Sequence, residues 1–140
     1  ETRPDVHLVM VGALTPALEA QAERLALDHA LHVIERIERE DMATLYTTAA
    51  VLLFPSHYEG FGLPVLEAQM CGTPVVCSDR GALQEVCWVT DSGVPPTEIK
   101  GLAQWTLHLI QNGPDNMERS RHSYSKLAWT FQHVQIYKTP

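Results

Sequence analysis

Two glutamates flanking a glycine-containing turn are the residues of this chain whose types and spacing could do chemistry. Glu59 and Glu67 are separated by seven residues, which include Gly60 and Gly62. Carboxylates accept pairs of hydrogen bonds from neighbouring hydroxyl groups, and glycine lets a ligand approach the backbone closely. A helix is expected to begin near Leu63, and the free backbone amides of a helix start attract anions. The pattern favours a ligand with both hydroxyls and phosphates, such as a sugar linked to a nucleotide.

Simpler interpretations of the same residues stay open at this point. Glu67 could merely complement the dipole of its helix, and Glu59 could be an ordinary loop acid. His57 and Tyr58 are expected to decorate the loop rather than to act as base and nucleophile. A pair of acids is also typical of glycoside hydrolases, but a glycine-flanked helix start has no evident task in that chemistry.

Short apolar runs alternate along the chain with segments of helical period. This alternation predicts an α/β fold, in which helices cover a parallel sheet and the sheet positions these residues. Strands are expected at 6–11, 31–35, 51–54 and 75–78, all buried on both faces, and a short edge strand at 87–90. A first helix is expected from Pro16 to about Asp28, capped by Thr15, and a second is expected to begin at an Asp41 cap. A third is expected from Leu63 to just before Gly72. Two more are indicated by apolar stripes, one of Leu102, Trp105 and Leu109 and the other of Tyr124, Leu127, Phe131 and Val134.

The glutamates belong to the loop and helix that follow the 51–54 strand. In an open parallel sheet, ligands bind beyond the carboxyl ends of the strands, so this loop is expected to lie at the ligand-binding edge. The amides of Leu63, Val65 and Leu66 are expected to lack intrahelical partners there. No linker divides the sequence, which predicts one domain over residues 1–140.

Composition and charge exclude several classes of protein. The chain has 140 residues, 45% of them apolar, and a net charge of −7 from 10 basic and 17 acidic side chains, which argues against nucleic-acid binding. No apolar run is long enough to span a membrane. The histidines and cysteines lack metal-ligand spacing, so no metal site is expected. Cys71, Cys77 and Cys87 are expected to be free thiols in a reducing, cytoplasmic compartment.

The stretch from Glu59 to Glu67 resembles the signature of the retaining glycosyltransferase group 1 family (family 4). The match extends through PSHYEGFGLPVLEAQMCGTPVV to Gly81 and Glu85–Val86. The resemblance implies a GT-B architecture, in which two Rossmann-like domains face a cleft. This chain is similar to the C-terminal, donor-binding domain, a three-layer Rossmann-like parallel sheet that would be a fragment of a two-domain enzyme.

The resemblance also implies a role for individual residues. Glu67 would hold the ribose hydroxyls of the nucleotide, and Glu59 would contact hydroxyls of the donor sugar as the candidate catalytic residue. Backbone amides of Gly60, Phe61, Gly62 and Leu63 would face the sugar and the diphosphate. Arg36 and Ile37 would lie near the base, and no metal would be needed for the transfer.

Some features of the family have no counterpart in this sequence. The family's domain opens with a strand that bears Gly-Arg and is followed by a lysine, and these cations bind the diphosphate. The acceptor domain, which would supply any peripheral membrane contact, has no counterpart either. We therefore expect weak donor binding and no transfer by these residues alone. Without the central strand, the strands at 6–11 and 51–54 would have free edges, which predicts their direct pairing or self-association of two copies.

Two other functions are compatible with the sequence. One is a non-catalytic module that binds a partner chain through its sheet edges or its C-terminal apolar stripe. The other is a different GT-B enzyme, such as a sugar-nucleotide epimerase, which the EGFGLP run fits poorly.

Overall fold

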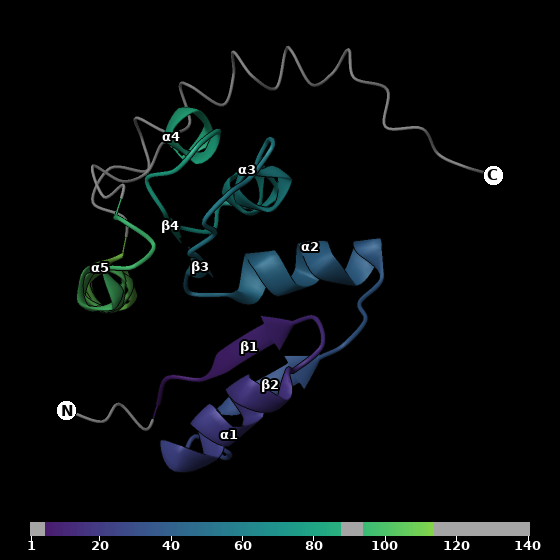
Figure 1. Cartoon of the computed structure of the whole chain (residues 1–140). Coiled ribbons are helices and arrows are strands. Elements are labelled where there is room, and N and C mark those ends of the chain that lie inside the picture. Colours follow the sequence, from purple (N-terminus) through teal and green to yellow (C-terminus); the bar gives the residue numbers. More distant parts are fainter. Residues whose placement is uncertain (1–4, 88–93, 114–140) are drawn as a thin grey trace. The chain divides into compact units, whose positions relative to one another are not determined.

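The computed structural model describes residues 5–87 and 94–113 (Figure 1). Its backbone divides into two compact units, Glu1–Met42 and Ala43–Pro140. Residues 88–90 of the edge strand expected at 87–90, and the final helix expected along Tyr124 to Val134, lie outside the described residues.

The first unit is a parallel β-α-β motif. Strand β1 (Leu8–Val11) is followed by helix α1 (Pro16–Arg24) and strand β2 (Leu31–Ile34), with Leu8 opposite Leu31 and Val11 opposite Ile34. Thr15 caps α1 as expected, because its hydroxyl accepts a hydrogen bond from the Leu18 amide at 3.3 Å. The helix ends at Arg24 rather than near Asp28, since Ala26 adopts a left-handed backbone conformation with φ +52°.

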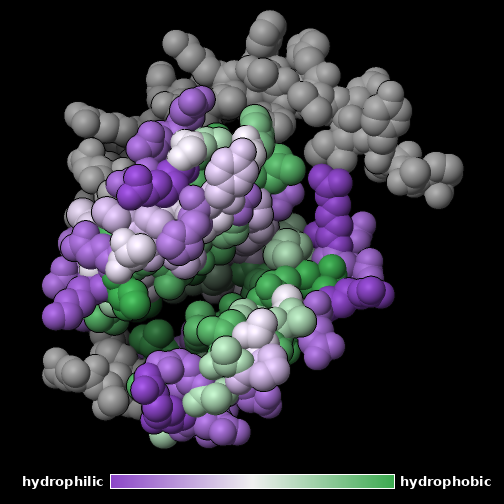
Figure 2. Space-filling view, viewed as in Figure 1, coloured by the Kyte–Doolittle hydropathy of each residue, from purple (hydrophilic) through white to green (hydrophobic). Residues whose placement is uncertain are grey.

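Strand β1 does not have the burial expected for it. The side chains of Leu8, Val9 and Val11 are 53%, 40% and 42% exposed, so the prediction of a strand buried on both faces is wrong here. A two-stranded sheet with a single helix covers too little of its own apolar surface. Hydrophobic residues accordingly reach the surface among hydrophilic ones (Figure 2).

Helix α2 (Arg39–Thr48) crosses the boundary between the two units. It begins two residues before Asp41, so Asp41 is not the cap that the sequence predicted. Asp41 and Glu40 instead lie in the first turn, where carboxylates complement the positive end of the helix dipole.

The second unit contains β3 (Leu52–Phe54), α3 (Leu63–Met70), β4 (Val75–Cys77), α4 (Leu83–Val86) and α5 (Ile99–Asn112). Strands β3 and β4 are parallel, with Leu52 opposite Val75. Strand β4 is buried along its whole length, as expected, because α3 packs on it and α5 contacts it as well. Val76 forms a core cluster with Val94, Leu102 and Leu109.

The strands therefore confirm the α/β class with parallel strands, consistent with the Rossmann-like fold. Within the described residues β1 pairs with β2 and β3 pairs with β4, giving two sheets of two strands each. The direct pairing expected between the strands at 6–11 and 51–54 stays a prediction, because the two strands belong to different units. No helix of the described residues is both long and apolar enough to cross a membrane.

A disulfide joins Cys77 to Cys87, so the expectation of three free thiols is wrong for this pair. Cys77 ends the buried strand β4, and Cys87 follows the last turn of α4. The two residues are ten positions apart, and such a spacing carries no signature of pairing. Cys71 is the free cysteine of the described residues.

We expect the Cys87→Ser variant to lower the free energy of unfolding by about 2–3 kcal/mol, because the crosslink restricts a loop of the unfolded chain. Urea denaturation without reductant measures the difference, and added reductant should abolish it. Cys71→Ser, which removes the free thiol, should change stability much less. Alkylation of both Cys77 and Cys87 in the native, unreduced protein would contradict the crosslink.

Candidate functional site

The predicted glycine turn and helix start are found where the sequence places them. Strand β3 ends at Phe54, an irregular loop follows, and α3 begins at Leu63 with Pro64 in its first turn. Glu59 is half-buried in this loop, while the side chains of Phe61 and Leu63 are 52% and 53% exposed. The loop therefore presents backbone and apolar side chains to solvent at the carboxyl end of β3.

The first turn of α3 offers fewer free amides than expected. The amides of Val65 and Leu66 donate to the Gly62 carbonyl oxygen at 3.1 and 3.3 Å. Pro64 has no amide hydrogen, so Leu63 is left as the residue of the first turn whose amide can face a ligand. The prediction that all three amides are free was wrong, because the Gly62 carbonyl accepts the first bonds of the helix.

The two glycines of the turn have different structural roles. Gly62 caps α3 in a left-handed conformation with φ +82°, and a Cβ on it would lie 2.8 Å from Leu83 Cδ2 and 3.1 Å from Val86 Cγ2. A Cβ on Gly60 would meet nothing within 4 Å. Gly62 is therefore required for packing against α4, whereas Gly60 borders open space.

Glu67 lies one turn into α3 and is half-buried beside the end of α2. The pKa of Tyr46 is raised to about 12, first by burial and then by the charge of Glu67, which also forms a hydrogen bond with the Tyr46 side chain. Burial and the Glu67 charge also raise the pKa of the Cys71 thiol. Tyr46 is itself held in place, because the Thr73 hydroxyl donates to its carbonyl oxygen. Glu67 is thus positioned by a buried hydroxyl rather than pointing freely into water.

We expect stability to depend on Tyr46 at high pH. The ordinary pKa of tyrosine is 10.0 and the folded value is about 12. The neutral hydroxyl is therefore favoured in the folded state, so its stabilisation is complete below pH 10 and is lost as the pH rises towards 12. This difference between the folded and the ordinary pKa of Tyr46 corresponds to about 2–3 kcal/mol in the free energy of unfolding. Urea denaturation from pH 9 to 12 should show a steeper loss for wild type than for Tyr46→Phe.

Tyr58→Phe is the matched control for this measurement, because the Tyr58 side chain is 83% exposed. Its stability should follow the wild-type profile. Parallel profiles of wild type and Tyr46→Phe would contradict the role of the buried hydroxyl.

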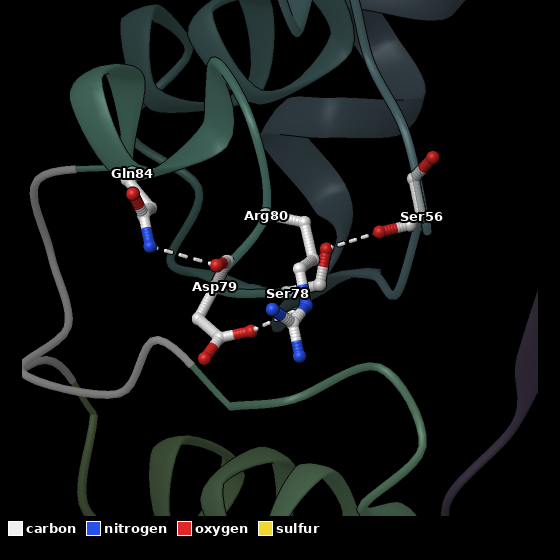
Figure 3. A network of polar contacts seen from close by, with 5 residues as sticks. All are labelled: Ser56, Ser78, Asp79, Arg80 and Gln84. Atoms are coloured by element: carbon white, nitrogen blue, oxygen red, sulfur yellow. Dashed lines mark hydrogen bonds and ion pairs between the residues drawn. The ribbon is translucent and has the colours of Figure 1, made fainter.

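A polar network joins the ends of β3 and β4 beside this loop (Figure 3). The Ser78 hydroxyl donates to the Ser56 carbonyl oxygen, and Gln84 Nε2 donates to the Asp79 carbonyl oxygen at 2.8 Å. Arg80 Nε lies 3.3 Å from Asp79 Oδ1. This network was not predicted, although its position directly after an expected strand is a signal that could have indicated it.

The network also reaches the loop that carries Glu59. A Cβ on Gly81 would lie 3.3 Å from the Glu59 carbonyl oxygen, so the turn after β4 rests on the backbone of Glu59. Helix α4 is fixed to α3 by Gln69, whose Nε2 donates to the Val86 carbonyl oxygen at 2.8 Å. Gln69 is 1% exposed, so this hydrogen bond is protected from water.

Two other predicted residues belong to the first unit, and two belong to the loop that carries Glu59. Arg36 is exposed and Ile37 is half-buried in the loop after β2, in the first unit, whereas Glu59 to Glu67 belong to the second. Their proximity to a base stays a prediction. His57 and Tyr58 are exposed in the loop. Among the residues that the structure describes, no group of three or more His, Cys, Asp or Glu side chains could hold a metal ion.

The model of the family "Glycosyl transferases group 1" matches residues 1–126. The chain therefore belongs to this glycosyltransferase family.

Named relatives agree with this assignment. The chain is 44% identical over 75 residues to the O-antigen chain mannosyltransferase B of Escherichia coli, a match that covers 52% of this chain and 19% of the relative. It is 33% identical over 126 residues to a D-inositol 3-phosphate glycosyltransferase of Mycobacterium sp. (strain KMS), covering 84% of this chain and 29% of the relative. It is 30% identical over 134 residues to a glycogen synthase of Mycobacterium tuberculosis, covering 93% of this chain and 32% of the relative. The chain thus spans about a fifth to a third of the relatives it matches.

Proposed function

We propose that this chain is the donor-binding part of a retaining glycosyltransferase, which transfers a hexose from a nucleotide-diphospho-sugar to a saccharide or lipid acceptor. The observation that carries the proposal is the environment of Glu67. This carboxylate stands one turn after the glycine turn and is held by the buried Tyr46 hydroxyl. A positioned carboxylate can accept both hydroxyls of a ribose.

The other residues of the site have complementary roles in this proposal. Glu59 contacts hydroxyls of the donor sugar, and the Leu63 amide and the open backbone at Gly60 face the diphosphate and the sugar. Arg36 and Ile37 are proposed to lie near the base of the nucleotide. Holding the donor in position and stabilising the leaving diphosphate are the contributions of this part to the transfer. The reaction is proposed to need no metal.

The proposal is tested by calorimetric titration of UDP, GDP and ADP into the 140-residue chain. One of the three should bind saturably and more tightly than the others, which identifies the base. A sugar acceptor added with the corresponding nucleotide-sugar should give no transfer, because the acceptor is expected to bind a separate domain of the complete enzyme. Absence of binding by all three nucleotides would overturn the donor-binding role.

The complete enzyme is proposed to act in the cytoplasm. The relatives are named as a mannosyltransferase, an inositol 3-phosphate glycosyltransferase and a glycogen synthase, so their names do not agree on one acceptor for this chain.

Self-association is a second proposal, which rests on the exposed strand β1. In the described sheets β1 has one strand partner, and Leu8, Val9 and Val11 are exposed along it. An unpaired apolar edge is a template for pairing with a second copy. Light scattering should then show concentration-dependent dimers that Val9→Lys disperses, whereas a monomer at every concentration would exclude this assembly.

A further inference from the structure

The disulfide of the second unit fixes the short helix α4. Cys77 ends β4 and Cys87 directly follows α4, so the bond closes the segment 78–86 into a loop. Helix α4 has four residues, and a helix this short depends on contacts from outside itself. The crosslink is therefore one of the attachments that keep α4 in place.

Helix α4 in turn supports the glycine turn. Helices α3 and α4 are in contact (Figure 1), and a Cβ on Gly62 would lie 2.8 Å from Leu83 Cδ2 and 3.1 Å from Val86 Cγ2. On the other side of the turn, a Cβ on Gly81 would lie 3.3 Å from the Glu59 carbonyl oxygen. A displacement of α4 would therefore reach the loop from Glu59 to Gly62.

The rest of the second unit does not depend on the crosslink alone. Gln69 Nε2 still binds the Val86 carbonyl oxygen at 2.8 Å, and Leu83 is fully buried. The core cluster around Val76 contains neither cysteine. Opening of the bond should therefore loosen α4 locally and leave the unit folded.

The two sulfurs differ in their access to a reductant. Cys77 is 1% exposed, whereas Cys87 is half-buried. Thiol–disulfide exchange needs a thiolate that reaches one of the two sulfurs. Cys87 Sγ is thus the atom that a reductant can attack.

Reduction by a dithiol at this sulfur takes two steps. The first thiolate of the reductant bonds to Cys87 Sγ, the Cys77–Cys87 bond breaks, and Cys77 leaves as a thiolate that takes up a proton. The second thiolate of the reductant then attacks its own sulfur in the mixed disulfide and releases Cys87, which is protonated in turn. The chain gains two electrons and two protons, and the reductant is oxidised from dithiol to disulfide.

We propose that the Cys77–Cys87 bond is a reversible redox switch that a protein dithiol opens at Cys87, and that its opening loosens α4 and the glycine turn and weakens donor binding. This inference rests on the proposed function and its cytoplasmic location, where disulfides are rare and those that form are usually transient, catalytic or redox-sensing. The competing view is a permanent crosslink that the folded chain keeps closed.

Three measurements on the oxidised 140-residue chain, made without denaturant and with dithiothreitol as the probe, distinguish these views. Alkylation and peptide mass spectrometry should show that dithiothreitol frees Cys77 and Cys87 in the folded chain. Hydrogen exchange of the Val86 and Cys87 amides, which bond within α4, should become about tenfold faster or more, while the amides of α5 stay unchanged. Calorimetry should show that the preferred nucleotide binds the reduced chain about fivefold or more weakly than the oxidised chain.

Variants of the three cysteines serve as controls. The double variant Cys77→Ser/Cys87→Ser should behave as the reduced wild type and should not respond to dithiothreitol. Cys71→Ser should keep the full difference between the oxidised and the reduced form, because Cys71 is outside the crosslink.

Each other outcome overturns the inference. Reduction that occurs only in urea concentrations that unfold the chain would show a permanent crosslink, and faster exchange throughout the second unit would show that the bond holds the whole fold. If the reduced chain keeps the exchange of α4 or the nucleotide affinity of the oxidised chain, no switch exists, while the donor-binding function stands. If no nucleotide binds either form, the proposed function fails and this inference fails with it.

Discussion

Replacing Gly62 by alanine is expected to destabilise the second unit by about 2–4 kcal/mol. Two costs combine in this estimate. The left-handed backbone at φ +82° is unfavourable for a residue with a Cβ, and the new atom would lie 2.8 Å from Leu83 Cδ2. Leu83 is fully buried, so its side chain cannot move aside easily. Urea denaturation should show a lower midpoint with little change in slope.

Gly60→Ala is the matched control for this variant. It adds the same methyl group two residues earlier, where nothing lies within 4 Å. Its free energy of unfolding should stay within about 0.5 kcal/mol of wild type. If both variants were equally stable, Gly62 would not be packed against α4 in the way that the structure shows.

Changing Glu67 to glutamine is expected to weaken binding of the preferred nucleotide about tenfold or more. Hydrogen bonds to a charged acceptor contribute about 1.5–3 kcal/mol, and the amide of glutamine accepts through one oxygen where the carboxylate offers two. The loss should appear equally for the nucleoside and its diphosphate, because the contact is to the ribose. Calorimetry with both ligands measures it.

Glu98→Gln removes the same charge from an exposed position at the start of α5 and serves as the control. Its nucleotide affinity should match that of wild type. Tyr46→Phe should reduce affinity less than Glu67→Gln, since it removes the group that orients Glu67 and leaves the carboxylate in place. Equal affinities of wild type and Glu67→Gln would reject the ribose contact.

Features set by neighbouring residues could be predicted from the sequence. The start of α3 follows from Gly62 and Pro64, whose backbone preferences are local, and the Thr15 cap of α1 follows from a hydroxyl that reaches its own helix. The parallel strands follow from apolar runs separated by helical segments. In each case the residues that determine the structure are close together in the chain.

Features that depend on distant residues could not be predicted in the same way. The bond between Tyr46 and Glu67 joins α2 to α3, and the Cys77–Cys87 disulfide joins β4 to the end of α4. The sequence separation of neither pair follows a helical or strand periodicity that would have indicated the contact. The expected burial of β1 failed for the same reason, because burial depends on which elements cover a strand and not on its own apolar residues.

The most direct test of the donor site is a map of backbone amide shifts in the isotope-labelled chain during titration with UDP, GDP and ADP. We expect one nucleotide to give saturable shifts concentrated at Glu59 to Glu67. Shifts absent from these residues for all three nucleotides, or confined to Glu1–Met42, would contradict a donor site built on the glycine turn and α3.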